Sequence, residues 1–306
     1  MKPVHIRFGG YQPPTSVHNK AAAILREALA TRLGDAVQFD LDGNIMASGH
    51  PAADLLPMVE SGTLTMCYFS ASYLATRVPE YALLDLPFTI HGREQAYGVL
   101  DGVLGRLLAD KLQARTGFRV LRFWDNGFRH LTNAVHPIRT PADCVGLRIR
   151  TLFSDVHRKL FKLLGFEPVA LDVKDPIAQV RSGAIEAQEN PLTNTYNFGI
   201  HLHHRYITLS GHFFGAAILL CHHASYAAWP AEVRQAVREA VLEATAAQRQ
   251  LAAREDEDVL AQLCPPQNVI IRLTDTERTR FVEAVAPVVE EQRHALGNQL
   301  CSYLGS

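Results

Sequence analysis

The residues best suited to chemistry in this sequence are two arginines in the stretch DCVGLRIRTLF, residues 143 to 153. Arg148 and Arg150 alternate there with Leu147 and Ile149, which is the two-residue period of a β-strand. A guanidinium group inside an apolar strand needs a partner, because burying an unpaired charge is costly. We therefore expect each arginine either in a structural ion pair or in contact with a ligand.

The position of Arg150 favours the ligand. Ligands of open α/β sheets bind outside the carboxyl ends of the strands. If residues 145–151 form such a strand, Arg148 lies near its middle and Arg150 at its carboxyl end. We expect Arg148 at a lobe surface and Arg150 in a cleft, although a structural ion pair is the ordinary role of any single arginine.

Two further polar residues have comparable positions. Arg129 follows a break at Gly127 in the predicted strand 121–133, where we expect the chain to cross between two lobes. Asn190 stands at the carboxyl end of another predicted strand, so the same rule places it at the cleft.

The elements that must hold these side chains follow a β-α-β rhythm. Val4, Ile6 and Phe8 alternate as in a strand, and Ser16 is placed to cap the helix that follows. Further strand and helix patterns succeed one another up to residue 69. This order predicts a mostly parallel sheet with helices on both faces.

An internal repeat supports two lobes of similar build. Residues 54–69 match residues 175–190 at an offset of 121, with Asp54 and Asp175 at equivalent positions and a Ser-Gly pair in each copy. Both copies have the pattern of a helix, a terminating glycine and a short strand.

A long helix is predicted over residues 230–263. The segment contains no glycine and no proline after Pro230, and the prolines at 265 and 266 stop it. About 33 residues at ~1.5 Å each give roughly 50 Å, which exceeds the width of a small domain. The apolar positions do not keep the heptad of a coiled coil, so we expect a helix that runs across both lobes.

Composition excludes several classes of protein. The chain has 306 residues with 47% hydrophobic and 20% charged residues, enough for one large or two medium domains. Lys and Arg total 30 against 31 Asp and Glu, which predicts no nucleic-acid partner. No apolar window of about 18 residues is present to span a bilayer. A cytosolic protein and an exported protein that has lost its leader both fit these values.

Common catalytic and metal-binding patterns are absent from the sequence. GxSxG, HExxH, GxGxxG after the first strand and GxxxxGK[ST] do not occur. Histidines cluster at 201–204 and 222–223, but neighbouring strand residues face opposite ways and offer no ready chelate. The five cysteines, among them Cys264, are odd in number and widely spaced. We expect no metal, no cofactor and no disulfide framework.

Several segments together resemble a known family. Residues 127–133 (GFRHLTN) look like its G-x-R-x-x-T/S-N segment, and residues 140–150 (TPADCVGLRIR) look like its hallmark around a conserved strand. Residues 86–88 (LPF), 182–191 (SGAIEAQENP) and 229–232 (WPAE) agree as well. The family is the DctP type of extracytoplasmic solute receptors, which serve tripartite ATP-independent periplasmic (TRAP) transporters.

The resemblance implies a two-lobed α/β fold of the type II-like periplasmic-binding-protein class, with a long helix along both lobes. Lobe I is expected to hold residues 1–125 and 214–254, and lobe II residues 126–213 and 255–306. The hinge segments are expected near 125, near 213 and in the helix 230–263.

The resemblance also assigns roles to the polar residues. In such receptors the arginine at the position of Arg150 makes a bidentate salt bridge to the substrate carboxylate, a geometry that lysine cannot copy. Asn190 supports it and Arg129 contributes. Side chains at predicted strand ends are expected to form the pocket wall, and their rings favour a ligand with an apolar or aromatic body: Phe69, Ser70, Trp124, Phe153, His212 and Phe213.

The sequence thus predicts a monomeric periplasmic receptor, not an enzyme, whose signal peptide has been removed. It is expected to bind an organic acid between its lobes and deliver it to the membrane subunits of a TRAP permease. The alternative is a cytosolic two-lobed enzyme or sensor that acts on a carboxylate, with Arg150 as the substrate clamp.

Overall fold

The computed structural model describes residues 3–171, 174–263 and 266–304. It divides into two compact units, each assembled from three separate stretches of chain. The first unit comprises residues 1–70, 105–125 and 216–255, and the second comprises residues 71–104, 126–215 and 256–306. Cys264, named above among the cysteines, lies outside the described residues.

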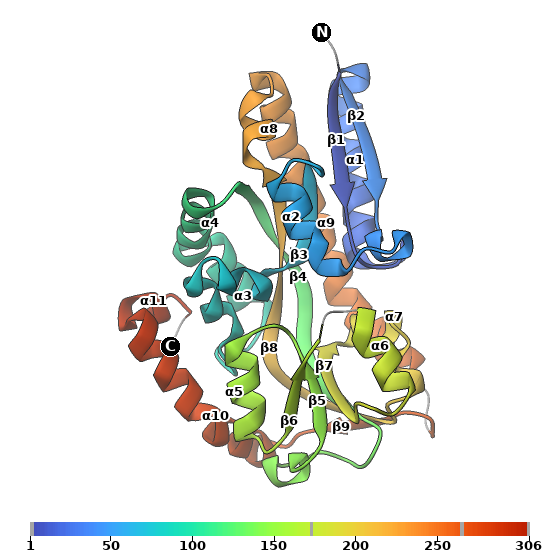
Figure 1. Cartoon of the computed structure of the whole chain (residues 1–306), viewed down its shortest axis with the longest axis vertical. Coiled ribbons are helices and arrows are strands. Elements are labelled where there is room, and N and C mark those ends of the chain that lie inside the picture. The colour runs from blue at the N-terminus through green and yellow to red at the C-terminus, as the bar shows by residue number, and fades with distance from the viewer. Residues whose placement is uncertain (1–2, 172–173, 264–265, 305–306) are drawn as a thin grey trace. The chain divides into compact units, whose positions relative to one another are not determined.

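The first unit begins with the predicted β-α-β rhythm (Figure 1). Its own elements are β1 (Val4–Gly9), α1 (Val17–Leu33), β2 (Val37–Asp42), α2 (Leu55–Glu60), β3 (Met66–Ser70), α4 (Val103–Arg115, apart from its first two residues) and α8 (His223–Ala228). β1 pairs in parallel with both β2 and β3. The Ser16 side chain accepts a hydrogen bond from the Asn19 N–H, which confirms the predicted cap of α1.

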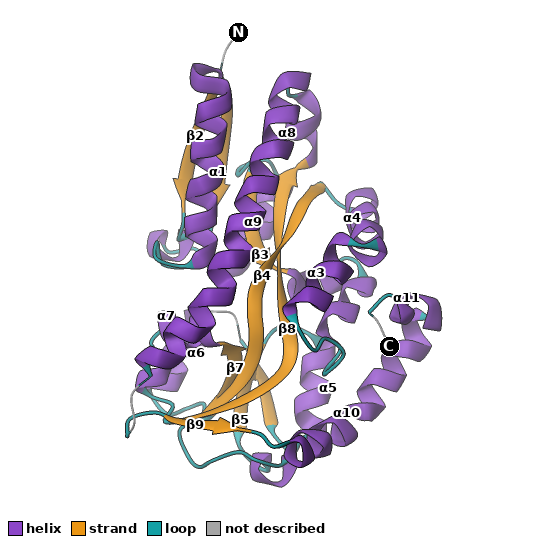
Figure 2. Ribbon diagram, turned by 180° about the vertical axis from the view of Figure 1, so that it is seen from behind, coloured by secondary structure: helices purple, strands orange, loops and turns teal. Residues whose placement is uncertain are grey.

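Besides α4, three elements contribute residues to both units: β4 (Phe118–Asn133), β8 (Tyr206–His222) and α9 (Ala231–Gln262). The length of α9 confirms the predicted long helix. In the first unit α1 and α9 lie on the same side of the strands (Figure 2), and Arg32 of α1 forms ion pairs with Glu239 and Glu243 of α9. The two helices therefore cover the same face of the sheet, and the ion pairs between them lie on the solvent side of that packing.

The second unit holds the remaining elements: α3 (Arg93–Asp101), β5 (Arg148–Thr151), α5 (Asp155–Leu163), β6 (Glu167–Ala170), α6 (Lys174–Arg181), β7 (Ala187–Pro191), α7 (Leu192–Asn197), β9 (Val269–Arg272), α10 (Asp275–Leu296) and α11 (Asn298–Ser302). β5 pairs in parallel with β6 and β7, and β7 pairs antiparallel with β4. Its apolar core gathers Ile149, Phe161, Phe213 and Phe281.

The internal repeat is confirmed at the level of its elements. α2 leads through Gly62 into β3, and α6 leads through Gly183 into β7. The two glycines have φ values of 77° and 74°, a left-handed conformation that side chains rarely adopt. Each copy therefore ends its helix in the same way before its strand begins.

Among the described pairings, β1 runs parallel to β2 and β3, β5 runs parallel to β6 and β7, and β8 runs parallel to β9, as predicted for a mostly parallel sheet. The exceptions are β4, which runs antiparallel to β7, and β8, which runs antiparallel to β3. One sequence-based expectation needs correction. Residues 71–104, expected in lobe I, belong to the second unit. The reason is their packing, since Ala82 joins Val156 and Val288 in one apolar cluster.

Candidate ligand-binding site

Arg150 lies in β5 opposite Gln188 of β7 and is 2% exposed. Its Nε and Nη2 donate to the carbonyl oxygen of Leu171 over 3.0 and 2.8 Å. Across residues 3–171, 174–263 and 266–304, no carboxylate forms an ion pair with it. Arg150 is therefore a buried cation whose described partner is a neutral carbonyl group.

Arg148, two residues earlier on β5, is in a different position. Its guanidinium and backbone N–H both donate to the carboxylate of Glu186, and both side chains are partly exposed. The bonds from Arg148 hold the pKa of Glu186 below its usual range, against the effect of partial burial. This placement confirms Arg148 as a surface residue with a structural ion pair.

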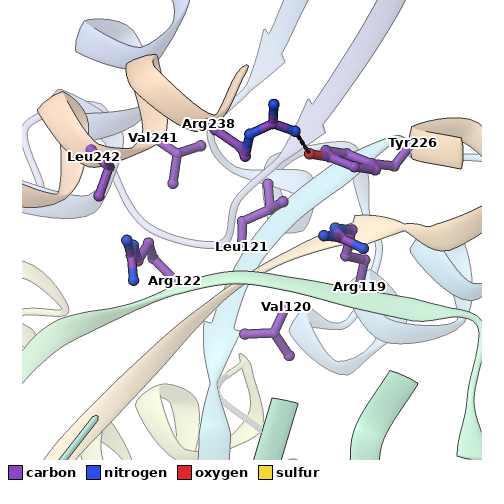
Figure 3. Close-up of a pocket in the computed structure, with 8 residues that line it drawn as sticks. All are labelled: Arg119, Val120, Leu121, Arg122, Tyr226, Arg238, Val241 and Leu242. Carbon is purple, nitrogen blue, oxygen red and sulfur yellow. Dashed lines mark hydrogen bonds between the residues drawn. The ribbon is translucent and has the colours of Figure 1, made fainter. Parts of the chain in front are cut away.

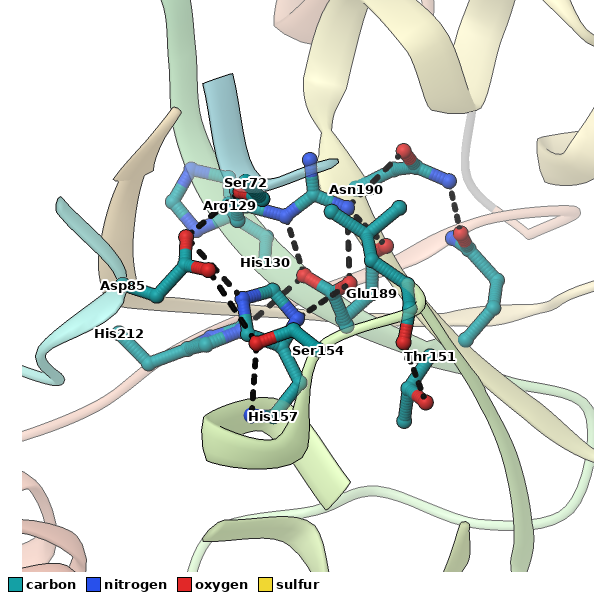
Figure 4. Close-up of polar contacts among 12 residues, drawn as sticks. Ser72, Asp85, Arg129, His130, Thr151, Ser154, His157, Glu189, Asn190 and His212 are labelled. Atoms are coloured by element: carbon teal, nitrogen blue, oxygen red, sulfur yellow. Dashed lines mark hydrogen bonds and ion pairs between the residues drawn. The ribbon is translucent and has the colours of Figure 1, made fainter. Parts of the chain in front are cut away.

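Arg129, on β4, forms a buried ion pair with Glu189 of β7 (Figure 4). Its Nε donates to Oε2 of Glu189, and its Nη2 donates to Oε1 at 2.7 Å and to the backbone carbonyl at 2.9 Å. Burial by itself raises the pKa of Glu189, but the positive charge of Arg129 and the nearby His212 imidazole hold it far below its usual range. The Glu189 carboxylate is thus ionised and neutralises Arg129.

Two imidazoles and a second carboxylate surround this pair. His212 Nε2 lies 3.4 Å from one Glu189 oxygen, and His157 lies 3.8 Å from the other and 3.3 Å from Asp85. Asp85 also accepts hydrogen bonds from Ser72 and Ser154, at 2.6 and 3.3 Å. Glu189, His157 and Asp85 were not predicted, although Glu189 is part of the QENP segment that carried the resemblance.

The side chains of β7 that alternate with Glu189 form an amide row beside Arg150. The Asn190 side chain donates to the side-chain Oε1 of Gln188, and Nε2 of Gln188 donates to the Thr132 hydroxyl at 2.6 Å. Asn190 also accepts a hydrogen bond from Nη2 of Arg129 at 3.3 Å. A guanidinium beside neutral amides is suited to holding an anion by hydrogen bonds.

The chain is similar to known proteins over most of its length. Residues 8–295 match the DctP model of bacterial extracellular solute-binding proteins, family 7. The chain belongs to this family. Family 7 proteins are extracytoplasmic, so the predicted periplasmic location is confirmed and the cytosolic alternative is not supported.

Three relatives show the range of the similarity. A protein of Sinorhizobium fredii with the name y4mM is 31% identical over 292 residues, which are 95% of this chain but 53% of that protein. The galactonate complex of DctPAm from Advenella mimigardefordensis has a TM-score of 0.94 at 27% identity, covering 99% of this chain and 97% of that one. A succinate-bound TRAP protein from Sulfurospirillum deleyianum has a TM-score of 0.93 at 26% identity, covering 100% and 99%. These likenesses confirm the two-lobed α/β fold of family 7.

The structure brings together only some of the residues predicted for the family 7 site. In the second unit Arg129, Asn190 and His212 all lie around Glu189, and Phe213 stacks on His157 with ring centroids 4.4 Å apart. Arg150 is on the strand next to Asn190.

The other predicted wall residues lie elsewhere. Phe69, Ser70 and Trp124 belong to the first unit, where Phe69 and Trp124 have no exposed surface and the Trp124 indole donates to Thr245. Phe153 is 46% exposed and borders a hollow of ≈ 390 Å³ in the second unit, lined also by Pro79, Val156 and Leu296 among others. Ligand contact by these four residues stays a prediction.

The histidine clusters form no metal centre among the residues that the structure describes, where no group of three or more His, Cys, Asp or Glu side chains is placed to hold an ion. His204 bonds to Thr132 at 2.9 Å, and His201 stacks on Tyr196. Within the described part of the chain, none of the helices has the length and apolar character needed to cross a bilayer.

Proposed function

We propose that this chain is the extracytoplasmic receptor of a TRAP transporter, that it binds an organic acid through Arg150, and that it delivers the acid to a membrane permease. The observation that carries the proposal is the contrast among three arginines. Arg129 and Arg148 have internal carboxylate partners, Glu189 and Glu186, whereas Arg150 bonds only to a carbonyl oxygen among the described residues.

A buried guanidinium without a counter-charge is costly, and a ligand carboxylate removes that cost. The planar fork of arginine fits the two oxygens of a carboxylate. Asn190 and Gln188, on the adjacent strand, are placed to hold the rest of the polar group.

The class of ligand follows from the chemistry and the relatives together. The two solved relatives named above were crystallised with galactonate and succinate, both of which carry a carboxylate. Charge-assisted hydrogen bonds contribute roughly 1.5–3 kcal/mol each, whereas micromolar affinity needs about 8 kcal/mol. Arg150 therefore supplies part of the affinity, and burial of the remaining ligand surface supplies the rest. An aromatic acid belongs in the test panel because of the predicted ring-lined wall.

Isothermal titration calorimetry with sugar acids, dicarboxylates and aromatic acids tests the proposal. For the acid that binds, Arg150→Ala and Arg150→Lys are both expected to weaken affinity at least about tenfold, the equivalent of ~1.4 kcal/mol. Arg148→Ala is the matched control, since it removes a guanidinium from the same strand that Glu186 already neutralises. Undiminished affinity in Arg150→Ala rules out the assignment.

We further propose that the site binds without catalysis. Glu189 is committed to Arg129, and Asp85 accepts bonds from two serines, so both buried carboxylates already have partners. Incubation of the bound acid with the protein, followed by NMR of the acid, is expected to show no conversion; turnover that disappears in Glu189→Gln contradicts this statement.

A further inference from the structure

A second concentration of positive charge lies in the first unit, at residues that take no part in the candidate ligand-binding site. It surrounds a hollow of ≈ 260 Å³ (Figure 3). The hollow is lined by residues of β4, α8 and α9: Arg119, Val120, Leu121, Arg122, Tyr226, Arg238, Val241 and Leu242. Three of its eight lining residues are arginines, and none is acidic.

Tyr226 brings two of these guanidiniums together. The Cζ atom of Arg119 lies 4.3 Å from the centre of the Tyr226 ring, and Nη1 of Arg238 donates to the Tyr226 hydroxyl at 3.3 Å. Two like charges thus contact one side chain, and Arg122 adds a third from the same wall of the hollow. Arg119 and Arg122 are partly buried and Arg238 is exposed, so solvent screens their mutual repulsion, and an anion bound among them replaces it with attraction.

The chain supplies no such anion among the residues that the structure describes. Arg119 donates to the side-chain oxygen of Gln113 at 3.3 Å, and Arg238 donates to that of Gln235. Neither these two nor Arg122 forms an ion pair with a described carboxylate. By contrast, Glu239 and Glu243 of the same helix α9 are paired with Arg32.

We propose that this hollow is a binding site for a compact oxyanion of two or more negative charges, namely a phosphate group. One carboxylate has two oxygens and fits one guanidinium fork, whereas a tetrahedral phosphate offers three or four oxygens to donors from several directions. The Val120, Val241 and Leu242 side chains leave room for an apolar group beside it. The phosphate is either free or part of an anionic lipid head group. This inference does not depend on Arg150.

The first test is phosphate binding at constant ionic strength. Sodium phosphate is titrated against sodium chloride while the melting temperature is followed, because an anion that binds only the folded chain raises it. We expect stabilisation by phosphate alone, unchanged in Arg150→Ala. The double variant Arg122→Gln/Arg238→Gln is expected to need at least about tenfold more phosphate for the same rise.

The matched control is Arg158→Gln/Arg293→Gln, two exposed arginines that already pair with Asp155 and Glu290. It removes the same charge from the surface and is expected to behave as the unaltered chain. A rise in melting temperature that chloride reproduces in full, or a phosphate-induced rise of equal size in both double variants, overturns the proposal.

Vesicles distinguish the source of the phosphate. Sedimentation with phosphatidylglycerol vesicles, compared with phosphatidylcholine vesicles, reports on a lipid head group. Binding to the anionic vesicles that is lost in Arg122→Gln/Arg238→Gln supports the head group, and a response to free phosphate alone supports the soluble anion. The absence of both responses refutes the site.

Discussion

The Arg129–Glu189 pair gives the sharpest test of how the second unit is held together. Replacing Glu189 with glutamine keeps the size of the side chain but removes its charge and turns one acceptor into a donor. The Glu189 side chain is 0% exposed and that of Arg129 is 4% exposed, so water does not solvate the charge that remains. Nη2 of Arg129 keeps its bond to the backbone carbonyl of residue 189, while the bonds that Nε and Nη2 donate to the carboxylate are lost or weakened.

The expected magnitude follows from that burial. Removing one partner of a buried ion pair costs about 3–5 kcal/mol, because the other charge loses the counter-charge that offsets its burial. At roughly 2–4 °C per kcal/mol, Glu189→Gln should lower the melting temperature by roughly 6–20 °C. Far-UV circular dichroism during heating measures the shift.

The control is Glu186→Gln, which makes the same chemical change in a similar Arg–Glu pair. The side chains of Glu186 and Arg148 are 27% and 44% exposed, so water can solvate the charge that remains. The decrease in melting temperature should therefore be a small fraction of that in Glu189→Gln. Equal shifts in the two variants refute the reasoning, because burial is the feature that separates the pairs.

The pH dependence of the same variant provides a second measurement. The folded-state pKa of Glu189 is depressed, so its contribution to stability is present above the unfolded pKa of about 4.3 and is lost as the pH falls below it. The unaltered chain should therefore lose stability in acid more steeply than Glu189→Gln.

Three further outcomes concern the first unit. Burial lowers the pKa of His18 to about 3. Below about pH 6.5 the unfolded chain therefore takes up a proton at His18 that the folded chain does not. This residue should lower the free energy of unfolding by ~1.4 kcal/mol for each unit by which the pH decreases. His18→Phe should flatten the melting temperature between pH 6 and 4, and an unchanged slope contradicts this. Tyr68→Phe removes a buried hydroxyl that accepts from the N–H groups of residues 11–12 and should cost about 1–3 kcal/mol in urea unfolding. Gln248→Ala should cost a similar amount, since the Gln248 amide bonds both the N–H and the carbonyl of Asp125 in the interior; a midpoint within error of the parent contradicts either expectation.

Features set by neighbouring residues could be predicted from the sequence. The cap of α1 at Ser16 depends on a bond to Asn19, three residues away, and α9 ends before paired prolines. The different environments of Arg148 and Arg150 also followed from their positions along one strand.

Features that depend on contacts between distant residues could not be predicted from the sequence. Glu189 is neutralised by Arg129, 60 residues earlier, and nothing in the local sequence marks a strand glutamate as buried. Residues 71–104 belong to the second unit because of contacts such as Asp85 with His157, which no local pattern reveals. The run of rings at strand ends indicated a wall, but it did not reveal that Trp124 packs against His18 and Tyr68 inside the first unit.

The division of each unit among three stretches of chain also determines when folding can finish during synthesis. β3 ends at Ser70 and pairs with β1 on one side, yet its partner on the other side is the part of β8 at residues 217–221, about 150 residues later in the chain. The first unit needs residues up to 255 and the second needs residues from 256 onward. Neither unit is complete until most of the polypeptide has left the ribosome, so the nascent chain remains open for most of its elongation. During that period the chain is still unfolded, which is the state that export across a membrane through a narrow channel requires.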